Sequence, residues 1–231
     1  PFGRLAWRPV RALAALLDRE RFDLVQANGS DTLKYSVLAR AWSGRAVPIV
    51  YRNISVMSHW LRGPLHRRFN RWLLSRVERV VAVSETSRQD VVDRLGYPAA
   101  RTATVPIGVE LPAEIDRTAA RRRLSALVPL EPDAPILVHV GSFTPEKDHA
   151  TLLEACRRLA ASHPRVRTVL VGDGPLKERI AAEAALPPLA GRVHLAGARA
   201  DAAELMAAAD LLVLSSRVEG IPGVLLEAAA R

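Results

Sequence analysis

Short runs of apolar residues recur along the chain, each bounded by polar or turn-forming residues. The eight runs are 23–27, 47–51, 79–84, 102–106, 135–141, 166–171, 192–197 and 210–216. Runs this continuous are typical of strands that are covered on both faces in a parallel sheet. Between them the apolar spacing becomes helical, as in 151–161, whose apolar side holds Leu152, Leu153, Cys156 and Leu159. We therefore predict an α/β protein with open, doubly wound sheets.

A proline-containing segment separates the first four runs from the last four. It spans 107–134 and includes a short amphipathic helical pattern, which is typical of a connection between domains. We predict a Rossmann-like domain over 1–112, a linker over 113–134 and a second Rossmann-like domain over 135–231, with their strand ends facing a cleft. Because the chain lacks an initial methionine and stops inside a helical pattern, we expect both domains to be incomplete and the fold to be truncated at both ends.

The net charge of +9 is confined to the first half of the chain. Through Pro112 there are 18 Lys and Arg residues against 9 Asp and Glu residues, and after it the counts are 15 and 15. An excess of this kind attracts an anionic partner or surface. The single cysteine excludes an internal disulfide and a cysteine-rich zinc site, and no apolar run is long enough to cross a membrane.

The segment 61–80 concentrates much of this positive charge. Its predicted apolar stripe is Leu65, Phe69, Trp72, Leu73 and Val77, and its basic residues are Arg62, Arg67, Arg68, Arg71, Arg76 and Arg79. An amphipathic helix packed on a sheet, with a solvated arginine face, explains this pattern. Attachment to an anionic membrane surface is a second explanation. Nucleic-acid binding is a third and weaker one, because no nucleic-acid motif accompanies the segment.

The stretch EGIPGVLLE near the end of the chain places two glutamates eight positions apart around a Gly-Pro turn. Pro222 suits the first residue of a helix, and Gly220 and Gly223 allow a ligand to approach the backbone closely. A helix N-terminus attracts anions, and a carboxylate can accept hydrogen bonds from paired hydroxyls. Glu219 and Glu227 together therefore fit a sugar–diphosphate–nucleoside, although each taken separately is better explained as a solvated or dipole-complementing helix residue.

This stretch resembles the Glu-x7-Glu motif of retaining GT-B glycosyltransferases, specifically family 4, the glycosyl transferases group 1. The matching residues are Ser216, Glu219, Gly220, Pro222, Leu225, Leu226, Glu227 and Ala228. Other segments resemble the family in order and spacing: VHVGSFTPEKDHATLLEA, LVGDGPLKERI, RVHLAG followed by LMAAADLLVLSS, and, in the first half, VVAVSETSRQDVV and TVPIGVE. The resemblance covers essentially the whole chain.

The resemblance implies a metal-independent, retaining hexosyltransferase that uses a UDP- or GDP-sugar and no cofactor. It implies that Glu219 orients the donor sugar, Lys147 neutralises the diphosphate and Glu227 holds the ribose. The implied donor-binding residues are Gly141, Ser142, Lys147, Gly172, Gly174, Glu219, Gly220, Ile221, Pro222, Gly223 and Glu227. The absence of an Asp-x-Asp triplet agrees with chemistry in which positive groups and helix N-termini stabilise the departing diphosphate.

Two positions depart from the family pattern. Ser142 follows the glycine of the phosphate loop, where many members have an arginine. Arg52 or Asn53 occupies the place of a histidine near the donor sugar, and Arg52 is our third candidate catalytic residue, beside Glu219 and Lys147. His139 lies in a strand run and is interpreted as a core or edge residue.

We expect a role in polysaccharide, glycolipid or cell-envelope biosynthesis, with a glycan, lipid-linked or small-molecule acceptor and no nucleic acid. The expected location is cytoplasmic, with peripheral attachment to the inner face of the membrane through 61–80 left open. Two alternatives remain. A sugar-nucleotide epimerase of the same fold would act without an acceptor, and a non-catalytic protein would bind only an anionic surface.

Overall fold

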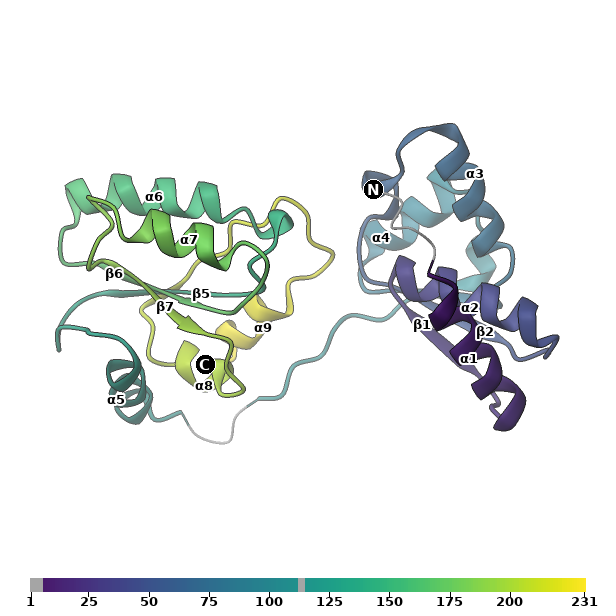
Figure 1. Cartoon of the computed structure of the whole chain (residues 1–231), viewed down its shortest axis with the longest axis horizontal. Coiled ribbons are helices and arrows are strands. Elements are labelled where there is room, and N and C mark those ends of the chain that lie inside the picture. Colours follow the sequence, from purple (N-terminus) through teal and green to yellow (C-terminus); the bar gives the residue numbers. More distant parts are fainter. Residues whose placement is uncertain (1–5, 112–114) are drawn as a thin grey trace. The chain divides into compact units, whose positions relative to one another are not determined.

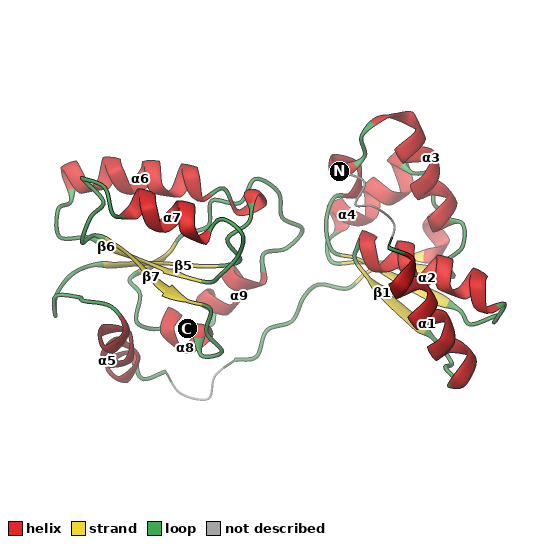
Figure 2. Cartoon of the chain, in the orientation of Figure 1, coloured by secondary structure: helices red, strands yellow, loops and turns green. Residues whose placement is uncertain are grey.

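A computed structural model describes residues 6–111 and 115–231 of the chain. The chain divides into two compact units (Figure 1). The first contains residues up to Ile107 together with Glu219–Ile221, and the second contains Gly108–Val218 together with Pro222–Arg231. Figure 2 shows that strands and helices alternate within each unit.

The first unit is built on a parallel sheet of four strands. They are β1 (Val25–Asn28), β2 (Ile49–Asn53), β3 (Arg79–Ala82) and β4 (Thr102–Thr104). The order in the sheet is β1-β2-β3-β4, so each strand pairs with the next one along the chain. All four predicted runs in this half therefore become strands, and the alternate positions Ile49, Tyr51 and Asn53 of β2 are fully buried.

Helices cover this sheet through apolar faces. They are α1 (Trp7–Arg19), α2 (Ser30–Ser43), α3 (Gly63–Leu74) and α4 (Glu85–Gln89), with shorter turns η1 (Met57–Trp60), η2 (Asp90–Arg94) and η3 (Ala99–Arg101). Leu33 and Val37 of α2 pack with Tyr51 in the main core. The buried side of α1 packs against Ala39 of α2 in a smaller cluster.

The segment 61–80 differs from its predicted form, because the helix ends at Leu74 and its apolar residues are divided between two faces. Leu73 is 1% exposed and joins the core with Leu74. Leu65 is 81% exposed and Trp72 is 38% exposed, so they do not lie on a buried stripe with Leu73 as predicted. The buried side of the helix carries Asn70, Leu73 and Leu74, so Leu65 and Trp72 are left on the side that faces solvent.

The second unit has four parallel strands in a different order. They are β5 (Ile136–Val140), β6 (Arg167–Val171), β7 (Val193–Gly197) and β8 (Leu211–Leu212), arranged β7-β6-β5-β8. The chain moves outward from β5 through β6 to β7 and then returns to the opposite side of β5. The last predicted run, 210–216, contributes a strand of only two residues, because the chain after it leaves the sheet to contact the loop that follows β5.

Helices lie on both faces of the second sheet (Figure 1). They are α5 (Arg117–Leu127), α6 (His149–Ser162), α7 (Lys177–Ala184), α8 (Ala202–Met206) and α9 (Gly223–Ala229), with a turn η4 (Pro145–Lys147). One face packs against α6 and α7, and the other against α5, α8 and α9. The doubly wound arrangement is therefore confirmed for this unit. Although α5 lies within the expected linker 113–134, its Leu124 is fully buried in this unit.

None of the helices in the described residues is both long enough and apolar enough to cross a membrane.

Candidate functional site

The order of strands in the second unit identifies one edge of its sheet as the place for a ligand. Strand β5 has β6 on one side and β8 on the other, so the connections that follow β5 and β8 leave the sheet in opposite directions. In open parallel sheets, the crevice at the carboxyl ends of two such strands is the usual binding site. The loop 141–148 follows β5 and the segment 213–218 follows β8, so both belong to this crevice.

Side-chain and main-chain hydrogen bonds join these two loops. The Ser215 hydroxyl donates to the Lys147 carbonyl at 2.7 Å, and the Arg217 amide donates to the Glu146 carbonyl at 2.9 Å. The Arg217 guanidinium donates to both carboxylate oxygens of Asp148, at 2.9 and 3.2 Å. These hydrogen bonds from Arg217, aided by the Thr151 hydroxyl, lower the pKa of Asp148. The backbone on both sides of Lys147 is thereby held in place.

Two of the predicted site glycines have a packing reason to be glycine. A Cβ atom on Gly172 would lie only 1.9 Å from the Gly141 carbonyl oxygen. A Cβ atom on Gly174 would lie 2.7 Å from the Phe143 carbonyl oxygen. The Phe143 amide also donates to the Asp173 carbonyl at 2.8 Å. The turn after β6 therefore packs directly against the loop after β5, which only residues without a side chain allow.

Lys147 lies across the start of the same loop. A Cβ atom on Gly141 would lie 3.6 Å from the Lys147 Cε atom and 3.4 Å from the His139 Nε2 atom. The exposed Ser142 places its hydroxyl 3.5 Å from that of Thr144. The structure therefore brings together five predicted donor-binding residues of this unit: Gly141, Ser142, Lys147, Gly172 and Gly174.

A pair of buried histidines lies beneath this loop. The sequence motifs did not identify this pair. The rings of His139 and His149 are 4.8 Å apart and edge-to-face, and Phe143 packs on His149 at the same separation. His139 is fully buried, as predicted, and its Nδ1 atom lies 3.0 Å from the Val213 carbonyl oxygen. Burial lowers the pKa of both rings, that of His149 to about 4.

A signal for His149 was present in the sequence. It lies three, four and seven residues before Leu152, Leu153 and Cys156, which are the buried residues of α6. That spacing continues the buried side of the helix back to its first turn. Neither ring nitrogen of His149 has a hydrogen-bond partner among the described residues, so the ring is held by packing alone.

The remaining predicted residues belong to other elements. Helix α9 begins at Gly223, one residue later than predicted, so Pro222 immediately precedes it. Glu227 lies within the helix. The Glu227 carbonyl accepts a hydrogen bond from Arg231 at 2.8 Å. Glu219, Gly220 and Ile221 are grouped with the first unit. Arg52 lies in the same unit, half-buried at the carboxyl end of β2.

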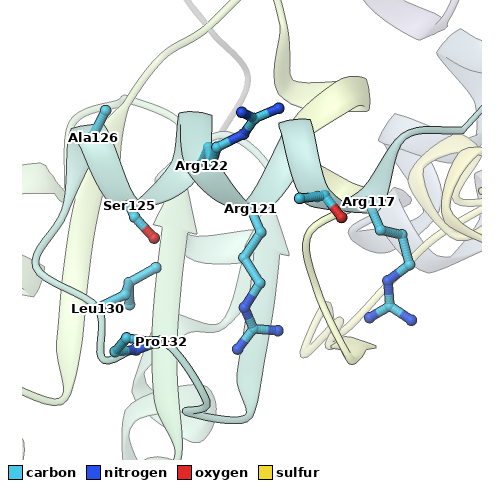
Figure 3. Close-up of a pocket in the computed structure, with 8 residues that line it drawn as sticks. Arg117, Arg121, Arg122, Ser125, Ala126, Leu130 and Pro132 are labelled. Carbon is cyan, nitrogen blue, oxygen red and sulfur yellow. The ribbon is translucent and has the colours of Figure 1, made fainter.

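A separate hollow of about 690 Å³ lies beside α5. It is lined by Arg117, Thr118, Arg121, Arg122, Ser125, Ala126, Leu130 and Pro132. Figure 3 shows Arg117 and Arg121 extending on one side of the helix and Arg122 on the other. Arg117 donates to Asp210 at 3.1 Å and Arg121 lies 3.6 Å from the same carboxylate, so both arginines fasten α5 to the residue that precedes β8. The hollow adjoins the opposite edge of the sheet from the loop 141–148, and no predicted site residue lines it.

No group of three or more His, Cys, Asp or Glu side chains within 6–111 and 115–231 is placed to hold a metal ion.

Comparison with known families identifies both halves of the chain. Residues 1–112 match the sequence model described as Glycosyltransferase Family 4, and residues 134–231 match the one described as Glycosyl transferases group 1.

Individual proteins agree with these matches. EpsF of Bacillus subtilis (strain 168) is 31% identical over 162 residues, which are 70% of this chain and 42% of EpsF. The lipopolysaccharide core biosynthesis glycosyltransferase LpsE of Rhizobium meliloti (strain 1021) is 36% identical over 99 residues, which are 43% of this chain and 28% of LpsE. The chain thus spans less than half the length of these relatives.

Solved structures establish the fold class. HepE of Anabaena, solved in complex with UDP and glucose, superposes with a TM-score of 0.79 at 23% identity. The superposition covers 100% of this chain and 62% of HepE. The predicted GT-B class, with two α/β units that each contain a parallel sheet, is therefore confirmed.

Proposed function

The chain belongs to the family 4 glycosyltransferases of group 1, and from this membership we propose that it moves a sugar from a nucleoside-diphosphate sugar to an acceptor with retention of anomeric configuration. The observation that carries the proposal is the pair of joined loops at the carboxyl ends of β5 and β8, which fixes the backbone around Lys147. HepE, which shares the fold, was solved with UDP and glucose, and this supports a nucleotide-sugar donor.

In the proposed mechanism the protein acts by positioning and charge. The Lys147 ammonium group neutralises the donor diphosphate as it departs. Glu219 orients the donor sugar and Glu227 accepts hydrogen bonds from the ribose hydroxyls. Arg52 is proposed as a further cation for phosphate or for an anionic acceptor. The departing diphosphate deprotonates the acceptor hydroxyl on the same face of the sugar, so no protein nucleophile takes part. In this proposal Lys147, rather than a metal ion, neutralises the diphosphate.

The proposed process is the synthesis of a cell-envelope polysaccharide or glycolipid. The name of LpsE, which refers to lipopolysaccharide core biosynthesis, supports this class of product. The acceptor is then a glycan, a lipid-linked sugar or a small molecule. We propose that the protein acts in the cytoplasm.

Calorimetric titration with UDP and GDP tests the donor site. We expect one nucleotide to bind, and Lys147→Ala to weaken it by about tenfold or more, because a charge-assisted contact to phosphate is lost. Glu227→Ala should weaken the same nucleotide through the ribose. Lys34→Ala, in α2 of the other unit, is the matched control and should leave binding unchanged.

Product analysis then separates the enzyme classes. Transfer of the sugar only when an acceptor is present supports the proposal, whereas isomerisation of the donor without an acceptor identifies an epimerase. If neither UDP nor GDP binds, the proposed donor site is wrong.

A further inference from the structure

All four tryptophans of the chain lie in the first unit, and all four are exposed. The exposed fractions are 52% for Trp7, 56% for Trp42, 41% for Trp60 and 38% for Trp72. Tryptophan is highly buried on average, since its large ring contributes more apolar area to a core than most side chains do. Four tryptophans left at the surface of a unit that has a well-formed core therefore indicate a contact with something outside the unit.

Arginines accompany these rings. The Arg11 guanidinium lies 5.6 Å from the centre of the Trp42 ring, and the Arg76 guanidinium lies 5.4 Å from that of Trp72. Trp7 also packs on Trp42, with ring centres 6.0 Å apart. The Trp42 and Trp72 rings thus each lie beside a positive charge, as cation–π contacts require.

The exposed face of α3 extends the same combination. Leu65 is the most exposed large apolar side chain of the described residues, and it lies seven residues before Trp72, on the same side of the helix. Arg67 and Arg68 follow it in the same helix and are both exposed. Within 6–111 and 115–231, neither of these two arginines forms a salt bridge with a carboxylate.

A hydrogen bond links the ends of the helices that carry these rings. Arg40, near the end of α2, donates to the Arg76 carbonyl at 2.6 Å, just beyond the end of α3. The end of α2 therefore lies close to the end of α3, so the two groups of rings belong to neighbouring helices.

We propose that this tryptophan–arginine surface, defined as Trp42, Trp60, Leu65, Arg67, Arg68 and Trp72, docks on an anionic lipid bilayer. Indole rings and a leucine fit the boundary between headgroups and acyl chains, while guanidinium groups bind lipid phosphates. The proposal names a partner for the first unit and does not depend on the donor site of the second.

The combination of positive charge and exposed apolar side chains favours a membrane over a nucleic acid. Phosphate contacts of a nucleic acid would use the arginines but would leave Leu65, 81% exposed, in water. A bilayer satisfies both kinds of side chain at once. Because the excess of positive charge belongs entirely to the first 112 residues, the attraction is directed through the same part of the chain.

Tryptophan fluorescence tests the proposal directly. Since the second unit contains no tryptophan, every change in emission reports on the first unit. We expect a blue shift with mixed phosphatidylglycerol–phosphatidylcholine vesicles, quenching when the acyl chains are brominated, and little response to phosphatidylcholine alone. Added salt should weaken the binding.

Paired variants locate the contact. Arg67→Gln combined with Arg68→Gln should weaken vesicle binding about 25-fold, at about fivefold for each basic residue near an anionic surface. Arg122→Gln combined with Arg165→Gln removes the same net charge from the second unit and should have little effect. Leu65→Ser should reduce quenching by brominated lipid and leave UDP or GDP binding unchanged.

Three results would overturn the proposal. One is the absence of vesicle binding by the wild-type protein, and another is equal weakening by the two double variants, which would indicate net charge alone. The third is binding to duplex DNA that matches or exceeds binding to vesicles, together with the absence of quenching by brominated lipid in the vesicle experiment. That result would identify a nucleic-acid surface. None of these results depends on whether the protein binds a nucleotide, so the donor site is judged separately.

Discussion

The two units have the same kind of sheet but use their charged side chains differently. In the second unit, arginines on several elements form ion pairs, as Arg157 and Arg179 do with Glu183 and as Arg217 does with Asp148. In the first unit, Arg88 pairs with Glu85, but the arginines of α3 have no ion pair with any carboxylate of the described residues. One unit therefore uses charge to hold loops together, and the other displays it.

This difference indicates two kinds of recognition. Paired arginines and packed glycines fix the loops around Lys147, which is what a small ligand of defined shape requires. An arginine-rich face with exposed tryptophans has no defined depth, and it suits an extended anionic surface. If the second unit holds its loops rigidly and the first displays its charge, substitutions in the two units should have different effects.

The largest effect is expected from Gly172→Ala. The added Cβ atom would lie 1.9 Å from the Gly141 carbonyl oxygen, so the turn after β6 must move away from the loop after β5. We expect the free energy of unfolding to fall by about 4 kcal/mol, at the upper end of the range for point substitutions. Denaturation followed by circular dichroism measures the loss.

Gly108→Ala is the control for this substitution, because a Cβ atom there would meet no atom within 4 Å. Tryptophan emission, which reports only on the first unit, should remain that of the native protein in Gly172→Ala before denaturant is added. A loss of stability below about 1 kcal/mol in Gly172→Ala would show that the loops are not rigidly packed.

Leu73→Ala and Leu65→Ala compare the two faces of α3. Leu73 is 1% exposed, and its truncation should lower the free energy of unfolding by about 3 kcal/mol, since a cavity forms in the core. Leu65 is 81% exposed, and its truncation should change stability by less than about 0.5 kcal/mol. Urea denaturation measures both. Similar losses in the two variants would mean that Leu65 is packed in solution.

Sequence periodicity predicted the elements better than it predicted their exposed faces. All eight apolar runs overlap a strand, because strands covered on both faces leave a strong apolar signal, although β4 has only three residues and β8 only two. In the predicted stripe from Leu65 to Val77, Phe69, Leu73 and Val77 do face the core, but Leu65 and Trp72 are exposed, because both faces of α3 carry large apolar residues. Exposure depends on where the helix ends against the sheet, and that is a property of the tertiary structure.

Acid should destabilise the second unit through the buried His149. Its pKa is about 4 in the folded chain, against 6.5 ordinarily, because burial disfavours the charged ring and the neighbouring His139 and Lys147 add to this. Above pH 6.5 the ring is neutral in both the folded and the unfolded chain, so it does not lower the free energy of unfolding. Between pH 6.5 and 4 only the unfolded chain takes up the proton, so the free energy of unfolding falls by up to about 1.4 kcal/mol per pH unit.

Denaturation at a series of pH values checks this slope. His149→Phe keeps an aromatic ring against Phe143 and should reduce the slope, whereas His59→Phe, at an exposed position of the first unit, should leave it as it is. An unchanged slope in His149→Phe would mean that other groups cause the acid sensitivity.

The site was only partly visible in the sequence. Motif spacing selected Gly141, Lys147 and Gly172, and the structure brings these three together. Nothing in the spacing indicated that Arg217 joins the two loops, because its partner Asp148 lies 69 positions away in the chain. Contacts of that kind depend on strand order, which places β8 beside β5.

The smallest effect is expected from Arg217→Gln. A glutamine can keep at most part of the hydrogen bonding to Asp148, and the exposed ion pair contributes modestly. Because the pair holds the backbone on one side of Lys147, its loss should weaken the binding of UDP or GDP by about fivefold. Calorimetry measures the change, with Arg158→Gln, an exposed ion-paired arginine on α6, as the matched control. Nucleotide binding that is equally weak in both variants would mean that general charge, rather than the joining of the two loops, sets the affinity.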